Sequence, residues 1–118
     1  MAELALHDGT VTLHLSRLEH VEGFRGDLSA PLSSVTAARA VTDPWSELRG
    51  IRAPGTGVPG VVAVGTRRGS FGKDFAAVHG KVPGVVVEFA DQEFARWVLT
   101  VDDAEAVAAS VAGAAGLG

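Results

Sequence analysis

Short runs in which apolar and polar residues alternate fill most of this chain, and glycine, proline and aspartate separate them. In residues 3–15 the aliphatic side chains fall on one side of the alternation and the polar ones on the other, as in a half-buried strand pair. Asp8-Gly9 lies between the two halves and supplies the positive φ angles that a two-residue type I′ turn needs. The segment therefore predicts a β-hairpin in which Glu3 faces His14.

Further runs with strand character follow this hairpin. The breaks between the later runs are short, so we expect neighbouring strands to pair antiparallel. The stretch Gly50–Gly60 is so rich in glycine and proline that it predicts a loop. The expected strands are residues 27–30, 35–41, 61–66, 73–79, 85–89 and 95–101.

Three segments carry helix signals. Ser16 and Glu19 form an S-x-x-E capping box, which predicts a short helix over residues 17–24. Asp43 before Pro44 predicts a helical turn, because aspartate caps helices and proline fits their first position. The last helix is indicated by apolar residues at helical spacing. These are Ala104, Val107, Ala108, Val111 and Ala115.

The length of 118 residues and the hydrophobic content of 47% suit one globular domain spanning residues 1–118. Cysteine is absent, which excludes disulfides, thiol catalysis and thiolate metal sites. The expected fold class is mainly β: a bent antiparallel sheet, or partly open barrel, of about seven strands capped by one C-terminal α-helix.

Four stretches spread over the chain resemble a family of small, uncharacterised bacterial domains with the pleckstrin-homology-like superfold. They are Pro31-Leu32-Ser33-Ser34-Val35, the segment 52–60 with Gly65-Thr66, Lys73-Asp74-Phe75, and Val101-Asp102-Asp103. The resemblance implies a domain that is not an enzyme and that assembles with copies of itself. Phosphoinositide-binding members of this superfold carry lysine and arginine in the first hairpin loop. Here that loop is His7-Asp8-Gly9-Thr10, so phosphoinositide binding is not expected.

The net charge and the N-terminal sequence limit the partners and the cellular location that we expect. The net charge of −4 argues against nucleic acid. No basic run opens the chain, and no segment approaches the roughly 20 apolar residues that span a bilayer. We therefore expect a cytoplasmic protein without membrane insertion.

Motifs for catalysis lack their structural context. The stretch Gly55–Gly60 matches G-x-G-x-x-G, but a strand is expected after it where dinucleotide binding requires a helix, and Pro59 lies where that helix would start. The histidines have no metal-ligand spacing, and a nucleophile elbow is missing. The sequence predicts no catalytic residue, no metal and no cofactor.

Two features are candidates for binding. Arg49, Arg52, Arg67 and Arg68 lie near the glycine-rich segment and could contact a phosphate or carboxylate, the alternative being a solvated rim. Trp45 could anchor a protein partner, because tryptophan is favoured at interface hot spots, and the alternative is packing under a loop.

The expected function is a non-catalytic interaction or scaffold module that forms homo-oligomers or binds another protein. A sheet that does not close leaves edge strands, and pairing two chains satisfies them. The alternative is a domain that binds a small anionic ligand with the Gly50–Gly60 loop and its arginines.

Overall fold

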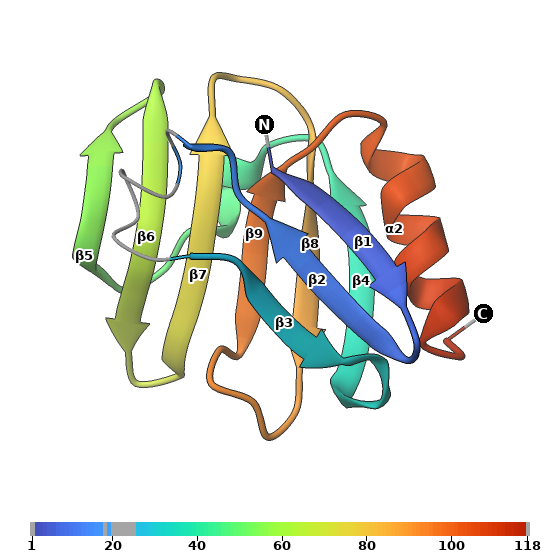
Figure 1. Cartoon of the computed structure of the whole chain (residues 1–118). Coiled ribbons are helices and arrows are strands. Elements are labelled where there is room, and N and C mark those ends of the chain that lie inside the picture. The colour runs from blue at the N-terminus through green and yellow to red at the C-terminus, as the bar shows by residue number, and fades with distance from the viewer. Residues whose placement is uncertain (1, 18, 20–25, 118) are drawn as a thin grey trace.

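The computed structural model describes residues 2–17, 19 and 26–117. Within them the chain forms nine strands in two sheets and one C-terminal helix (Figure 1). The expected mainly β class, a bent sheet capped by a helix, is confirmed, and the sheets do not close into a barrel. Eight of the nine strands correspond to runs expected from the sequence, and the ninth lies in the segment Gly50–Gly60 that was predicted as a loop.

The small sheet contains β1, β2 and β3 in that order, all antiparallel. Its hairpin confirms the predicted register, with Glu3 opposite His14. Asp8 and Gly9 have φ angles of 48° and 75°, as a type I′ turn requires. The bounds are β1 Glu3–His7, β2 Thr10–His14 and β3 Leu28–Pro31.

The large sheet has the order β4-β8-β9-β7-β6-β5. Short 3₁₀ turns precede its first two strands in the chain: η1, Leu32–Ser34, and η2, Pro44–Glu47. Asp43 caps η2 by accepting a hydrogen bond from the Trp45 amide, as predicted. The bounds are β4 Val35–Val41, β5 Ile51–Val58, β6 Val62–Gly69, β7 Gly72–His79, β8 Gly84–Phe89 and β9 Arg96–Thr100.

The prediction that all neighbouring strands pair antiparallel is wrong at one place. β9 lies between β7 and β8 and runs parallel to β7, with Phe75 opposite Trp97. The connection after β7 leads to β8, which does not pair with β7 but lies one strand position away from it. β9 then fills the position between β7 and β8 and pairs antiparallel with β8. Burial is consistent with this order, because all five residues of β9 are buried, as expected for a strand in the middle of a sheet.

The predicted loop over Gly50–Gly60 is also wrong, because most of it is strand β5. β5 pairs antiparallel with β6, and the register shifts between Arg52 and Gly55, which marks a β-bulge. Proline is tolerated at an edge strand or a bulge, and Pro54 has both settings. Pro59 and Gly60 then form the turn to β6, closed by a hydrogen bond from the Val61 amide to the Val58 carbonyl.

The main core lies between the inner face of the large sheet, the small sheet and the C-terminal helix. Trp97 and Phe75 are its largest side chains, exposed by 2% and 0%. The ring centroids of Trp97 and Phe89 lie 4.6 Å apart. The burial of Trp97 confirms that it lies on the apolar face expected from the alternating residues of β9.

The C-terminal helix α2, Ala104–Ala114, covers β4 at one end of the large sheet. It buries Ala104, Ala108 and Val111, which confirms the predicted apolar face. Asp103 stands at its N-cap position with φ 54° and makes no side-chain capping bond. α2 therefore closes the β4 edge, whereas β5 forms the opposite edge of the sheet.

The predicted capping box is present at Ser16. Its amide donates to Glu19 Oε1 over 2.8 Å, and the Glu19 amide donates to Ser16 Oγ over 3.2 Å. Glu19 is buried, and its Oε2 lies 3.4 Å from Nδ1 of His79, the last residue of β7. Arg17 and Glu19 are helical, and the rest of the helix predicted over 17–24 lies outside the described residues.

A Gly84→Ala substitution should lower the free energy of unfolding by about 1–3 kcal/mol, because a Cβ at this site overpacks the sheet. The added atom would overlap the Leu99 carbonyl oxygen and lie 2.7 Å from Pro44 Cγ. Gly113→Ala is the matched control: nothing lies within 4 Å of its Cβ position in α2. Alanine there should stabilise by about 0.5–1 kcal/mol. Urea unfolding of both variants measures the difference, and equal effects would contradict the close packing at Gly84.

Candidate functional site

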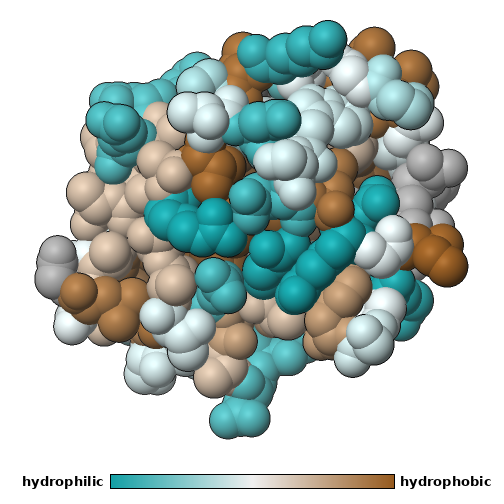
Figure 2. Space-filling view, turned by 180° about the vertical axis from the view of Figure 1, so that it is seen from behind, coloured by the Kyte–Doolittle hydropathy of each residue, from teal (hydrophilic) through white to brown (hydrophobic). Residues whose placement is uncertain are grey.

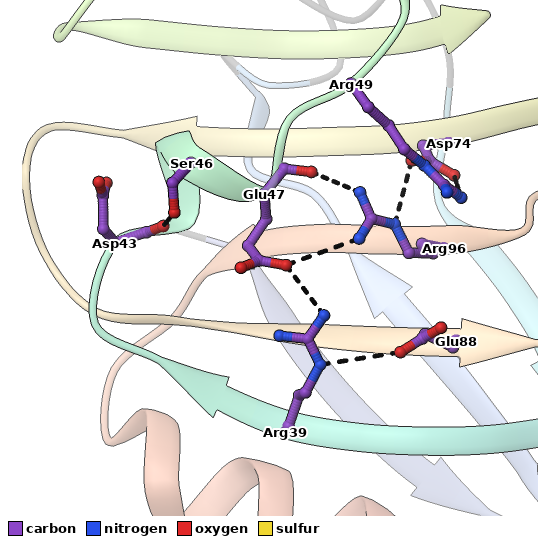
Figure 3. A network of polar contacts seen from close by, with 8 residues as sticks. All are labelled: Arg39, Asp43, Ser46, Glu47, Arg49, Asp74, Glu88 and Arg96. Atoms are coloured by element: carbon purple, nitrogen blue, oxygen red, sulfur yellow. Dashed lines mark hydrogen bonds and ion pairs between the residues drawn. The ribbon is translucent and has the colours of Figure 1, made fainter. Parts of the chain in front are cut away.

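A cluster of charged side chains lies on the outer face of the large sheet, and at one end of it Asp74 of β7 lies between Arg49 and Arg96 (Figure 3). Asp74 is only 1% exposed. Its carboxylate accepts two hydrogen bonds from Arg49, over 2.6 and 3.0 Å, and one from Arg96 of β9 over 3.1 Å. Arg49 also stacks on the Phe71 ring, 3.9 Å from its centroid. The parallel pairing of β7 and β9 places Asp74 directly beside Arg96.

Glu47 of η2 connects Arg96 to Arg39 of β4. Its backbone carbonyl accepts a hydrogen bond from Arg96, and its carboxylate lies 3.6 Å from the Arg96 guanidinium. The same carboxylate accepts a hydrogen bond of 2.9 Å from Arg39, which lies 3.7 Å from Glu88 of β8. The cluster therefore fastens η2 across four strands of the sheet.

The cluster balances its own charge. Three arginines and three carboxylates alternate in the chain of contacts, so their formal charges sum to zero. The hydrogen bond to Asp74 raises the pKa of Arg49 above its ordinary value, and that to Glu47 raises the pKa of Arg39. Each carboxylate lies within 4 Å of a guanidinium, and this arrangement is suited to holding the outer face together. Figure 2 shows the resulting hydrophilic band across the middle of this face.

The structure distributes the four predicted anion-binding arginines over this region. Arg49 is held by Asp74, and Arg67 donates to the Arg49 and Gly50 carbonyls over 3.0 and 3.1 Å. Arg52 is paired with Arg67 in the β5–β6 register, and Arg68 is exposed opposite Ile51. Arg49 and Arg67 thus serve internal contacts, and anion binding by these residues stays a prediction.

Trp45 packs against the sheet rather than standing out from it. Its indole nitrogen donates to the Gly80 carbonyl over 2.7 Å, and its ring covers a small second core on the outer face. This core contains Ala63, Val78, Val86 and Val98. The half-buried ring also borders a shallow groove of about 340 Å³ beside Gly57, Val58 and Arg67. Partner binding by Trp45 stays a prediction, and its position places it next to β5.

β5 is the open edge of the large sheet, and in Figure 1 it stands at the end opposite α2. It pairs with β6 on one side, and no strand of the described residues pairs with its other side. Ile51 and Val58 at its two ends are 76% and 49% exposed, and Val61 in the following turn is 59% exposed. An edge strand with exposed aliphatic side chains is the kind of surface on which chains pair.

Sequence reasoning missed the charged cluster, although a signal for it exists. Glu88 and Arg96 are single charges between apolar residues within strands, and Asp74 opens the apolar run of β7, where charges are unusual unless they are paired. Such isolated charges indicate a paired network. The partners could not be assigned, because Asp74 meets Arg96 only through the parallel pairing of β7 with β9.

Comparisons with family models, curated proteins and solved structures found no match for this chain. The resemblance to the pleckstrin-homology-like superfold thus remains an expectation from sequence. Among the helices of the described residues, none has the length and apolar character to cross a membrane. In the same part of the chain, no three histidine, aspartate or glutamate side chains gather closely enough to hold a metal ion.

Proposed function

We propose that this protein is a non-catalytic interaction module that associates with a second copy of itself through the edge of β5. The observation that carries the proposal is the open edge with an exposed aliphatic side chain at each end. The opposite edge of the sheet is covered by α2 and does not compete for a partner.

The bulge in β5 puts both aliphatic side chains on one face of the sheet. Ile51 is opposite Arg68 and Val58 is opposite Val62, and these two partners are six residues apart on β6. Residues separated by an even number along a strand point to the same face, so Ile51 and Val58 also share a face. Without the bulge their odd spacing would place them on opposite faces.

Two β5 strands that pair antiparallel about a twofold axis bring Ile51 of each copy beside Val58 of the other. The apolar contact then forms twice on the same face, at both ends of the strand pair. The same register places Arg52 opposite the partner's glycine at position 57, so no like charges oppose each other. The bulge and Pro54 interrupt the middle of the strand, so we expect a weak dimer, with a dissociation constant on the order of 10 µM.

Sedimentation velocity over a series from about 1 to 500 µM measures this association. The wild-type chain should shift from monomer to dimer, whereas Ile51→Lys and Val58→Glu should each stay monomeric at concentrations where wild type is half dimeric. Both sites are exposed, so these changes should leave the folded monomer intact. The double variant Ile51→Lys with Val58→Glu places lysine beside glutamate twice and should restore the dimer.

Ala109→Lys, on the exposed side of α2, is the control for added charge and should dimerise like wild type. A wild-type chain that stays monomeric throughout the series would refute the proposal. A dimer that survives Ile51→Lys would refute the β5 edge as its interface, and failure of the double variant to recover would refute the antiparallel register.

A further inference from the structure

A second open edge lies at β1, where the small sheet faces α2 across an apolar groove. The groove has a volume of about 190 Å³ and is lined by Leu4 and Leu6 of β1 and by one side of α2. Leu6 is 37% exposed there. From α2 the lining residues are Ala106, Val107, Ser110 and Val111, with Asp103 at the end where α2 begins.

The backbone of β1 is oriented to bond an added strand in this groove. In a two-residue hairpin the pair beside the turn, here His7 and Thr10, exchanges its hydrogen bonds, and the pairs then alternate. The peptide groups of Leu4 and Leu6 therefore point away from β2, toward the open edge. Within the described residues, β1 pairs with β2 alone.

Acidic side chains of the described residues gather at one end of the groove, and Asp103 lines it. β1 and α2 both begin at the same end in Figure 1, where Glu3 and Asp103 are exposed, and Asp102 and Glu105 are exposed close by in the sequence. Asp103 makes no capping bond with its side chain, so its carboxylate is available to a ligand. A basic residue is the complement of this end, and alternating aliphatic residues are the complement of the groove.

We propose that the β1–α2 groove binds an extended segment of a protein partner as a fourth strand of the small sheet. The segment runs antiparallel to β1, places an aliphatic side chain in the groove at every second position, and carries lysine or arginine near its C-terminal end. Backbone hydrogen bonds to Leu4 and Leu6 hold the strand, and the groove and Asp103 select the sequence. This site is separate from the β5 edge.

The probe is a fluorescein-labelled peptide, Val-Ser-Leu-Ser-Val-Lys-amide, titrated with the protein in low salt and followed by fluorescence polarisation. Ser110→Trp fills the groove from an exposed position of α2 and should weaken binding at least tenfold. Ala109→Trp is its matched control, because position 109 is exposed but does not line the groove, and it should bind like wild type.

Asp103→Asn and a peptide with glutamate in place of lysine test the charge. Asparagine tolerates the left-handed conformation at position 103, so the helix should be retained. Each change should weaken binding about threefold, and by less at high salt. Absence of saturable binding by wild type, or equal binding by Ser110→Trp, would refute the proposal. If Ser110→Trp instead weakened self-association, the occupant would be a second copy and the partner proposal would be wrong.

Discussion

Replacing Asp74 with asparagine should lower the free energy of unfolding by about 1–3 kcal/mol, because buried Arg96 loses one of its two carboxylate partners and keeps Glu47, 3.6 Å away. Arg96 is only 9% exposed and cannot turn to water without opening the contact between η2 and β9. Arg49 is more exposed and can relax into solvent, so the loss arises chiefly at Arg96. Urea unfolding followed by circular dichroism measures the effect.

Glu88→Gln is the control for this prediction, because it also removes one carboxylate from the same cluster. Its side chain is 38% exposed and lies 3.7 Å from Arg39, so the change should cost less than about 1 kcal/mol. Equal effects of the two substitutions would show that burial does not determine the strength of this cluster.

Truncation of Trp97 to alanine should cost about 3–5 kcal/mol, as is typical for a buried aromatic residue whose cavity cannot collapse. The side chain is 2% exposed, belongs to the central strand and touches Phe89. The hydrogen-bonding strands on both sides of β9 prevent the backbone from moving in to fill the space.

Trp45→Ala provides the comparison, because it removes the same side chain from a half-buried site. It should cost about 1–2 kcal/mol, from lost packing on the outer face and from the hydrogen bond to Gly80. Unfolding in urea with circular dichroism detection ranks the two variants. A Trp45 variant less stable than the Trp97 variant would contradict the assignment of the main core to the inner face.

Local signals predicted the elements whose determinants lie close together in the sequence. The Asp8-Gly9 turn defined the hairpin register, Asp43-Pro44 marked the start of η2, and helical spacing identified the buried face of α2. Each depends on contacts within a few residues. The mainly β class followed from the same kind of local evidence.

The features that sequence reasoning missed depend on contacts between distant segments. β5 has the composition of a loop, and only its pairing with β6 makes it a strand. The alternation of apolar and polar residues does not determine the order of strands in a sheet, so it could not predict that β9 lies beside β7. The charged cluster follows from that order, so it could not be assembled before the order was known.

The position of β9 has a consequence for how the chain acquires its structure. β9 is the last strand in the sequence, yet it separates the half of the sheet built by β5, β6 and β7 from the half built by β4 and β8. Until β9 is in place, these halves share no hydrogen-bonded ladder, and the carboxylate of Asp74 lacks one of its two guanidinium partners. During synthesis the two halves can join only after β9 has been made, and a product that lacks β9 exposes two unpaired strand edges that favour aggregation.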